Sequence, residues 1–365
     1  MRVALVTEFY YPHLGGVTEH VHNLALELRR RGHEVTIITS HMHGETKDPD
    51  FVRRVGRSRV IYSNGAFARI TTGWRLTDRL ADVLRDIRAE VVHVQDGLAP
   101  VLGPWASDAA WRLGLPVVAT FHSWFSWSFG YWAFRPLFQR RLDRIAAKIA
   151  VSEPVVHALS RYVRAEWEII PNGVDVQTFH PNGAVRGGPP RLLFLGRLDP
   201  RNGLGTVLAA LPSVLARFPE TELVVAGDGP LRSFYERQAR HLGANVRFVG
   251  YVNGERPDYY DRADLYLCPT TKASFGITLL EAMACGTPLV VSDITGFREL
   301  VGGGAEAQLV DKDDPAAWSA AVLRLIDNPE RRAAMGRAGL EKARRFAWPV
   351  IADRVVDVYR RVVSQ

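Results

Sequence analysis

The sequence contains only two cysteines, Cys268 and Cys285, and both lie among apolar residues without the spacing of metal ligands. We therefore predict two small core residues, with no disulfide framework and no metal site. No apolar run reaches the roughly 18 residues that a membrane-spanning helix needs. The chain also opens directly on an apolar strand, which leaves no room for a signal peptide. These absences predict a cytoplasmic protein.

Neither composition nor charge is extreme, but the balance of charge is positive. The 365 residues carry a formal net charge of +7, and 47% of them are apolar and 23% charged, as in ordinary globular proteins. This length is sufficient for two α/β domains, each with its own core. The positive charge favours anionic partners, which include phosphates, acidic lipid head groups and nucleic acid.

Strands and helices alternate in two successive parts of the chain, which predicts two Rossmann-like α/β domains. Between the two parts, the segment 180–190 is rich in Pro, Gly and Asn, as linkers are, so we predict domains at 1–182 and 183–349. In the first part the pattern predicts strands at 2–7, 34–39, 91–94, 117–120, 149–152 and 169–175, and a helix at 17–30. In the second it predicts strands at 191–195, 222–226, 246–249, 264–268 and 289–291, and helices at 204–217 and 231–241.

The stretch 269–293 combines a short helix with a buried strand. From Phe275 onward the apolar residues recur at spacings of three and four, which predicts the helix. Ser274, Phe275 and Gly276 precede it and offer free backbone N–H groups at its positive end, where a phosphate would bind. Glu281 is the polar exception on this helix, and its carboxylate must either reach water or hold a polar ligand.

Two loops of the first part follow predicted strands and carry candidate ligand-binding residues. Gly15 and Gly16 directly precede the helix 17–30, as in loops that approach phosphates, although the GxGxxG pattern of dinucleotide sites is absent. His122 follows the strand 117–120, at the edge where open α/β sheets bind ligands. An isolated histidine at such a place is equally often a structural hydrogen-bonding group, so both interpretations stay open.

An aromatic run extends from Trp124 to Phe134 and is followed by Arg135, Arg140, Arg141 and Arg144. Aromatic rings beside arginines suit the interface of an acidic phospholipid membrane. A packed aromatic helix with a solvated basic face explains the same pattern. Stacking on nucleic acid is a third interpretation, but no recognisable nucleic-acid-binding motif supports it.

The order of several short motifs resembles that of the retaining nucleotide-sugar glycosyltransferases of GT-B fold, and in particular the bacterial phosphatidylinositol mannosyltransferases. The matching stretches are GGVTEHV, SNGAFARI, ATFHSW, IAVSEPV, IPNGVD, FLGRLDPRNG, GDGP and the stretch 269–293. The resemblance implies two Rossmann-like domains facing each other across a cleft, with the C-terminal helix 350–365 packing back on the first. It also implies transfer of mannose from GDP-mannose to a membrane lipid at the inner face of the cell membrane, without metal or other cofactor and without nucleic acid.

The resemblance further implies roles for individual residues, which fall into three sets. Catalytic roles are implied for His122, Arg197 and Glu281. Donor binding is implied for Gly15, Gly16, Arg197, Asn202, Gly227, Ser274, Phe275, Gly276, Ile277 and Glu281. Acceptor binding is implied for Thr18, His20, Asn64, Arg69 and Ser123.

At three positions the sequence departs from the family pattern. Asn202 stands in place of a lysine that accompanies Arg197 at the diphosphate, Ala273 in place of a glutamate at the donor sugar, and Ala66 in place of a serine at the acceptor. Losing a charge-assisted contact costs about 1.5–3 kcal/mol. The sequence therefore leaves three hypotheses. The first is a transferase with an altered donor contact, whose donor could be UDP-glucose or UDP-N-acetylglucosamine and whose acceptor could be soluble. The second is a degenerate relative that binds nucleotide or lipid with little transfer, and the third is a nucleic-acid-binding protein.

Overall fold

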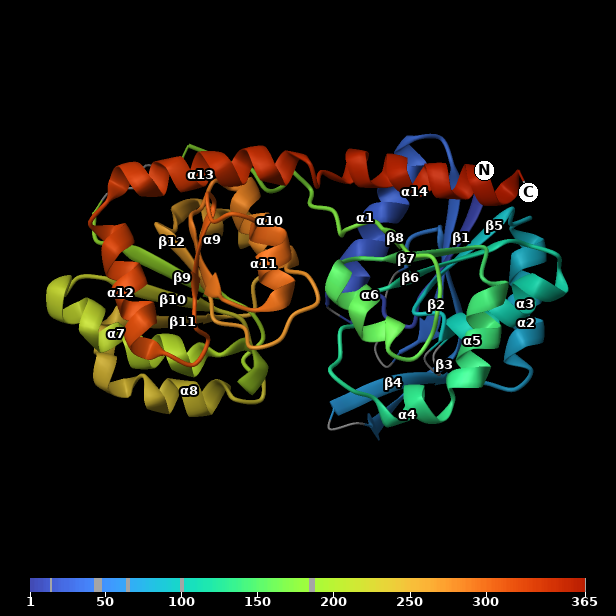
Figure 1. Ribbon diagram of the computed structural model, residues 1–365, viewed down its shortest axis with the longest axis horizontal. Helices are drawn as coiled ribbons and strands as arrows, with labels where there is room; N and C mark the ends of the chain where they lie inside the picture. The colour runs from blue at the N-terminus through green and yellow to red at the C-terminus, as the bar shows by residue number, and fades with distance from the viewer. Residues whose placement is uncertain (14, 43–47, 64–65, 99–101, 184–187, 365) are drawn as a thin grey trace. The chain divides into compact units, whose positions relative to one another are not determined.

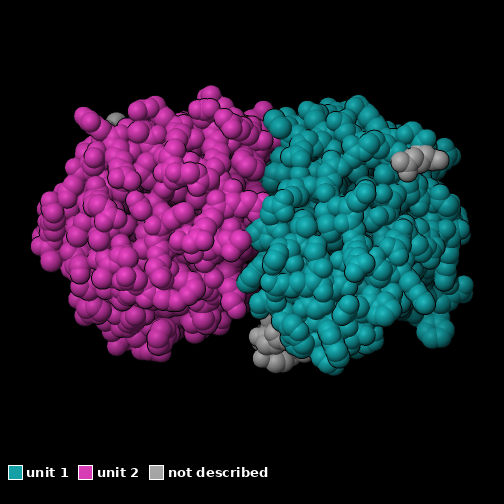
Figure 2. Space-filling model, in the orientation of Figure 1, with its two compact units in different colours: residues 1–173, 348–365 teal, residues 174–347 magenta. Residues whose placement is uncertain are grey.

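The computed structural model describes residues 1–13, 15–42, 48–63, 66–98, 102–183 and 188–364. The chain divides into two compact units (Figure 2). The first contains residues 1–173 together with 348–365, and the second contains residues 174–347. Each unit is an α/β domain built on its own sheet (Figure 1).

The first unit is built on an eight-stranded sheet of order β4-β3-β2-β1-β5-β6-β7-β8, which is parallel except for the pair β3–β4. Successive residues of β1 point to opposite faces, so Val3 and Leu5 join one core and Ala4 and Val6 the other. The strands are β1 (Arg2–Val6), β2 (Glu34–His41), β3 (Val52–Ser63), β4 (Ala66–Thr72), β5 (Val91–Gln95), β6 (Val117–Phe121), β7 (Ala147–Ala150) and β8 (Glu168–Ile169).

Helices cover both faces of this sheet. The core that contains Ala4 and Val6 includes residues of α2 and α3, whereas the core of Val3 and Leu5 includes residues of α1 and α14. The helices are α1 (Gly16–Arg30), α2 (Leu76–Asp86), α3 (Leu102–Arg112), α4 (Phe129–Ala133), α5 (Arg135–Arg144), α6 (Glu153–Ser160) and α14 (Trp348–Val363).

The second unit is built on a six-stranded, entirely parallel sheet of order β11-β10-β9-β12-β13-β14. The strands are β9 (Arg191–Leu195), β10 (Glu222–Ala226), β11 (Val246–Gly250), β12 (Leu265–Cys268), β13 (Leu289–Ser292) and β14 (Ala307–Val310). The helices are α7 (Leu204–Arg217), α8 (Arg232–Gln238), α9 (Arg256–Arg262), α10 (Ile277–Ala284), α11 (Thr295–Val301), α12 (Pro315–Ile326) and α13 (Pro329–Arg344). Both cysteines are buried in the core of this unit and neither forms a disulfide, which confirms the prediction of two small core residues.

The division between the units falls after Gly173, nine residues before the predicted boundary at 182/183. The reason is that the segment after Gly173 is bound to the second unit. The Val174 N–H donates to the Phe346 carbonyl oxygen at 2.8 Å, and the Val174 and Phe179 side chains lie in the second unit's core. Linker composition therefore marks a surface segment that already belongs to the second unit.

The chain returns to the first unit at α14, which packs on α1. Pro349 occupies the first turn of this helix, where its missing N–H costs nothing. Trp348 lies against Gly173, where an added Cβ would stand 2.5 Å from the indole ring. The glycine of the IPNGVD motif is thus required by the tryptophan that starts the last helix.

Within the described ranges, none of the helices combines the length and the apolar character needed to cross a bilayer.

Candidate active site

In the first unit, the strand order reverses between β1 and β5, and ligands of open α/β sheets bind beyond the carboxyl ends at such a point. The loop after β1 leads to Gly15 and Gly16, which begin α1 and leave the N–H groups of its first turn free for an anion. Thr18 is fully buried, and its hydroxyl donates to the His13 carbonyl oxygen at 2.9 Å. Its side chain therefore fixes the loop, which is a role other than the predicted contact with an acceptor.

Three buried histidines lie at and behind this edge. The His20 ring packs edge-on against the His122 ring, with centroids 4.8 Å apart, and against Trp348 at 5.4 Å. His93 makes hydrogen bonds of 2.6 Å to the Tyr359 hydroxyl and 2.7 Å to the Thr120 hydroxyl. The structure thus brings His20 and His122 together, and it adds His93, which sequence reasoning missed.

Burial keeps these imidazoles neutral. Desolvation lowers the pKa of His20 to about 4 and that of His93 to about 3, and it lowers the pKa of His122 well below the usual value. The His122 Nε2 lies 2.6 Å from the Gln95 side-chain oxygen. With the Gln95 amide oxygen, which only accepts, turned toward the ring, Nε2 carries the proton and Nδ1 keeps its lone pair.

Asp96 is a second residue that the sequence analysis missed. It directly follows β5 in the left-handed region, at φ 57°, and its carboxylate accepts from the His122 backbone N–H at 3.4 Å. Burial raises the pKa of Asp96 to about 6, so this carboxyl group can take up or release a proton near neutral pH. The signal was an acidic residue directly after a buried strand, in the same relation to β5 as His122 to β6.

The other three predicted acceptor residues are Ser123, Asn64 and Arg69. Ser123 is exposed and adjoins His122. Asn64 lies outside the described residues, and Arg69 lies in β4, of which only the backbone is described at that position. The roles of all three remain predictions.

Glu8, which lies just after β1, links the paired strands β3 and β4 to the end of β1. The Glu8 carboxylate is buried and accepts from the Thr71 hydroxyl at 2.7 Å, the Ser58 hydroxyl at 3.3 Å and the Leu102 N–H at 3.0 Å. Desolvation raises its pKa in spite of these donors. The two strands β3 and β4 of this hairpin were not predicted from sequence, because arginines interrupt the apolar pattern of β3.

In the second unit, the strand order reverses between β9 and β12, and the loops that follow these strands meet. Gly227 has φ 142°, and a Cβ there would stand 2.0 Å from the Gly196 carbonyl oxygen. Gly203 has φ 71°, and a Cβ there would stand 2.1 Å from the Pro269 carbonyl oxygen. These glycines allow the loops after β9, β10 and β12 to touch, backbone against backbone.

Arg197 projects from this junction, with 71% of its side chain exposed and its nearest carboxylate, Asp199, at 4.0 Å. Asn202 does not act as a second cation. Its amide donates to the Arg197 carbonyl oxygen at 2.8 Å, which fixes the loop that presents the arginine. Arg201 and Lys272 are further exposed cations on the same loops, so the site retains positive charge without the family lysine.

The loop after β12 leads into α10, with Gly276 at its N-cap. Ser274 and Ile277 are half-buried, whereas Phe275 is buried in the core beside Phe346. Phe275 can therefore offer a ligand its backbone N–H, while its ring anchors the loop.

Glu281 lies on α10 with 3% of its surface exposed. One carboxylate oxygen accepts from the Arg256 guanidinium at 2.8 Å and the other from the Tyr260 hydroxyl at 3.0 Å. Burial and the neighbouring carboxylate raise the pKa of Tyr260 well above its ordinary value. Of the two alternatives left by the sequence, exposure to water is excluded. Arg256 and Tyr260 both come from α9, which the sequence did not connect with Glu281.

In the described part of the chain, no group of three or more His, Cys, Asp or Glu side chains is placed to hold a metal ion.

Comparisons with protein families cover nearly the whole chain. Residues 14–178 match the family "Glycosyltransferase Family 4" and residues 175–342 match "Glycosyl transferases group 1". The phosphatidyl-myo-inositol mannosyltransferase of Mycolicibacterium smegmatis is 33% identical over 368 residues, which cover 99% of this chain and 94% of that protein. A glycogen synthase of Mycobacterium tuberculosis is 30% identical, over 98% of this chain and 94% of that protein.

Solved structures give the same fold. The sucrose-phosphate synthase of Thermosynechococcus elongatus superposes with a TM-score of 0.77 at 22% identity, covering all of both chains. Anabaena HepE in complex with UDP superposes with a TM-score of 0.79 at 17% identity, covering 99% of this chain and all of that one. At these identities the likeness establishes the fold, which is the GT-B fold with two Rossmann-like domains.

Proposed function

Since this chain belongs to the group 1 glycosyltransferases of GT-B fold, we propose that it transfers mannose from GDP-mannose to an inositol phospholipid such as phosphatidylinositol, with retention of configuration. One observation carries this choice of donor and acceptor. Relatives named phosphatidyl-myo-inositol mannosyltransferase are 33% identical over 99–100% of the chain. The glycogen synthases also cover 98% of the chain, but at 30% identity.

In this proposal the second unit binds the donor. The N–H groups at the start of α10 and the guanidinium of Arg197 hold the diphosphate, because developing negative charge needs donors and a cation already in place. Glu281 accepts from the ribose hydroxyls, and Arg256 and Tyr260 orient its carboxylate for that purpose. Gly227 keeps the neighbouring backbone free of side-chain atoms where the donor approaches.

The first unit contributes the acceptor side of the reaction. The bond between the anomeric carbon and the diphosphate oxygen breaks, and the inositol hydroxyl oxygen bonds to the same face of the sugar. Its proton passes to the departing diphosphate, so the reaction needs no separate protein base. We assign the neutral His122, held through Nε2 by Gln95, to a hydrogen bond with the donor sugar, and we place His20 behind it.

A lipid acceptor requires a surface that meets the membrane, and we assign this role to the aromatic face of α4 and α5. We define this face as Trp127, Phe129, Trp132, Phe134 and Leu137, each of which is 53–63% exposed. Phe125 and Tyr131 of the same run, and Phe138 of α5, pack against the core and hold the two helices in place. The run therefore has a packed side and an exposed side, and exposed aromatic rings suit the head-group region of a bilayer.

The neighbouring arginines divide in the same way. Arg135 and Arg140 are exposed and free to meet anionic head groups. Arg141 forms a salt bridge of 2.5 Å with Asp108, and the Arg144 guanidinium lies 4.0 Å from the centre of the Trp111 ring. The membrane interpretation of the sequence included all four arginines, whereas the last two are occupied within the protein.

The donor is tested by thermal shift with GDP-mannose, UDP-glucose and UDP-N-acetylglucosamine. A ligand at 100 times its dissociation constant stabilises the protein by about 2.7 kcal/mol. We expect this shift with GDP-mannose and its loss in Arg197→Ala, with Arg237→Ala, an exposed arginine of α8, as the matched control. A shift with a UDP-sugar alone would select the alternative donor, and no shift with any of the three would refute the proposal.

The membrane surface is tested by co-sedimentation with vesicles that contain phosphatidylserine, at low and high salt. We expect salt-sensitive binding that is lost when Trp127 and Trp132 become Ala and weakened in Arg135→Gln/Arg140→Gln. Each basic residue near an anionic surface contributes roughly 1 kcal/mol, so the double change should lower the partition coefficient about 10–30-fold. Wild-type protein that stays in the supernatant at low salt would favour a soluble acceptor.

A further inference from the structure

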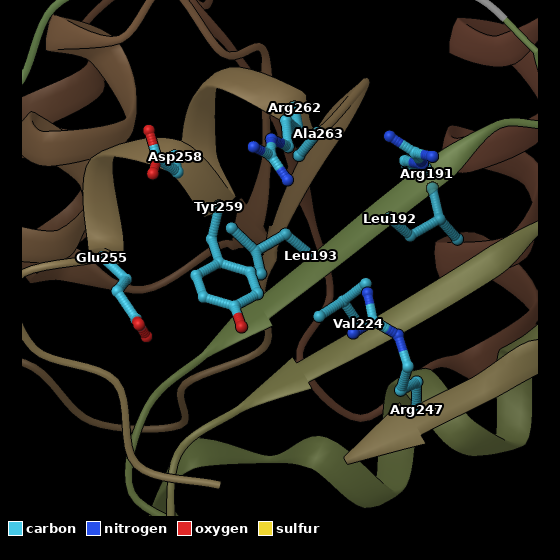
Figure 3. Close-up of a pocket in the computed structure, with 10 residues that line it drawn as sticks. All are labelled: Arg191, Leu192, Leu193, Val224, Arg247, Glu255, Asp258, Tyr259, Arg262 and Ala263. Atoms are coloured by element: carbon cyan, nitrogen blue, oxygen red, sulfur yellow. The ribbon is translucent and has the colours of Figure 1, made fainter. Parts of the chain in front are cut away.

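A separate cavity of about 310 Å³ lies in the second unit at the amino-terminal edge of the sheet (Figure 3). Its floor includes the first residues of β9, Arg191 to Leu193, whereas the donor loop follows the last residue of that strand, Leu195. The five residues of β9 make four steps of about 3.3 Å, so the two ends of the strand are about 13 Å apart. The cavity is therefore distinct from the candidate donor site, and its size lies at the lower end of the range for small-molecule sites.

The charged side chains around this cavity are separated by sign. Figure 3 shows the Tyr259 ring in the middle, with Glu255 and Asp258 on one side and the guanidinium groups of Arg191, Arg247 and Arg262 on the other.

Some of these charges already have partners. The Glu222 carboxylate accepts from the Arg247 Nε at 2.7 Å and lies 3.7 Å from the Arg191 Nε. It therefore contacts the Nε atom of both arginines. The Asp258 carboxylate accepts from the Asn182 amide at 3.1 Å. Arg262 is exposed and has no ion-pair partner among the described residues. With Glu222 counted, three positive charges face three negative ones, so a purely anionic ligand would gain from one side and be repelled by the other.

We propose that this cavity binds a phosphorylated sugar. Planar guanidinium groups are suited to a phosphate, to which each can donate two parallel hydrogen bonds. The carboxylates of Glu255 and Asp258 are acceptors only, and sugar hydroxyls are the neutral donors that suit them. Between the two groups, the half-buried Tyr259 ring offers an apolar face to the sugar ring. A small ester with a phosphate at one end and hydroxyls at the other matches both sides of the cavity.

The helix α9 connects this cavity with the candidate donor site. Arg256 and Tyr260, four residues apart, both contact Glu281. Glu255, Asp258, Tyr259 and Arg262 are spaced by three, four and seven residues and line the cavity. On a helix these spacings define two different faces. A ligand that shifts α9 from the cavity side therefore changes the position of the Glu281 partners.

This coupling rests on the proposed function, whereas binding in the cavity does not. Linkage requires that the sugar phosphate change the affinity for GDP-mannose by the same factor as GDP-mannose changes the affinity for the sugar phosphate.

Binding is tested by titration calorimetry of the full chain with mannose 6-phosphate, mannose and inorganic phosphate. We expect saturable one-to-one binding of mannose 6-phosphate, at least tenfold weaker binding of the other two, and at least tenfold weakening by Arg262→Gln. Arg240→Gln, an exposed arginine outside the cavity, is the matched control and should bind as the wild type does. Circular dichroism of both variants shows whether they are folded.

Three outcomes would overturn the proposal: no saturable binding of mannose 6-phosphate, equal affinity for inorganic phosphate, or unchanged affinity in a folded Arg262→Gln variant. A second titration with GDP-mannose, with and without saturating mannose 6-phosphate, measures the coupling. If GDP-mannose does not bind at all, the proposed function fails while the first titration still decides the cavity. If GDP-mannose binds with the same affinity in both titrations, the coupling through α9 is refuted.

Discussion

Replacing Arg256 by methionine should destabilise the protein far more than neutralising Glu281. Methionine keeps most of the apolar stem of Arg256 but removes the charge. The Glu281 carboxylate, at 3% exposure, then loses this cation, while the Tyr260 hydroxyl still donates to it. Breaking a buried ion pair by removing one partner costs about 3–5 kcal/mol. Since 18% of the Arg256 side chain is exposed, we expect about 3 kcal/mol, at the lower end of that range.

The reverse change, Glu281→Gln, should cost only about 1 kcal/mol, the net value of a hydrogen bond, because the partly exposed Arg256 can turn toward water. In the double variant Arg256→Met/Glu281→Gln no charge remains buried, so about 2 kcal/mol of the loss should return. Urea unfolding followed by circular dichroism measures all three free energies of unfolding.

The pattern of the three losses is more informative than any one of them. Equal losses in the two single variants, or a loss below about 1 kcal/mol in Arg256→Met, would show that water reaches the Glu281 carboxylate in solution. In that case the carboxylate would not be held in one orientation for a ribose. The two single variants tested with GDP-mannose separate the structural effect from binding, because Glu281→Gln removes the carboxylate assigned to the ribose and Arg256→Met retains it.

Two further predictions concern backbone contact and protonation. Gly227→Ala should lower the free energy of unfolding by more than 2 kcal/mol or abolish folding, because the new Cβ would stand 2.0 Å from a carbonyl oxygen. Gly205→Ala is the control and should fold normally, since its Cβ would lie 3.7 Å from the nearest atom. Thermal denaturation compares the two variants. Between pH 6.5 and 4 the free energy of unfolding should fall as the pH falls. The reason is that His20 and His93, with pKa values lowered to about 4 and about 3, take up protons mainly in the unfolded chain. Asp96, with a pKa raised to about 6, takes up a proton in the folded chain and opposes this effect in part. Urea unfolding at pH 7 and 5.5 should differ by about 1–2 kcal/mol, and equal or higher stability at pH 5.5 would contradict the burial of these rings.

Much of the fold could be predicted from the sequence because parallel strands buried on both faces appear as short apolar runs. The helix 204–217 was predicted with the bounds that the structure gives it. The hairpin β3–β4 could not be predicted in this way, because β3 carries arginines at positions that a buried strand would fill with apolar residues. The strand β14 was also missed, since it lies within a segment whose overall pattern is helical.

The candidate site could be predicted only in part. Glycines directly before a helix and the residue that follows a strand are local signals, and they pointed to Gly15, Gly16 and His122. The groups that set the behaviour of these residues are brought near by the fold alone. Gln95 is 27 residues from His122, and Arg256 is 25 residues from Glu281. Local spacing contains no information about such partners. The charge state and orientation of the site residues could therefore not be predicted from the sequence and follow only from the fold.

The backbone hydrogen bond between Val174 and Phe346 has a consequence for protein engineering. The two ends of the second unit meet there, since the Val174 N–H donates to the Phe346 carbonyl oxygen and Val174 also pairs with Ala347. In topological terms, residues 174–347 are therefore a cassette inserted into the first unit, with its entry and exit side by side. To exchange this cassette between relatives, the chain would be joined after residue 173 and again after residue 347, and these two junctions lie next to each other. The helix α14 would remain with the first unit, on which it packs.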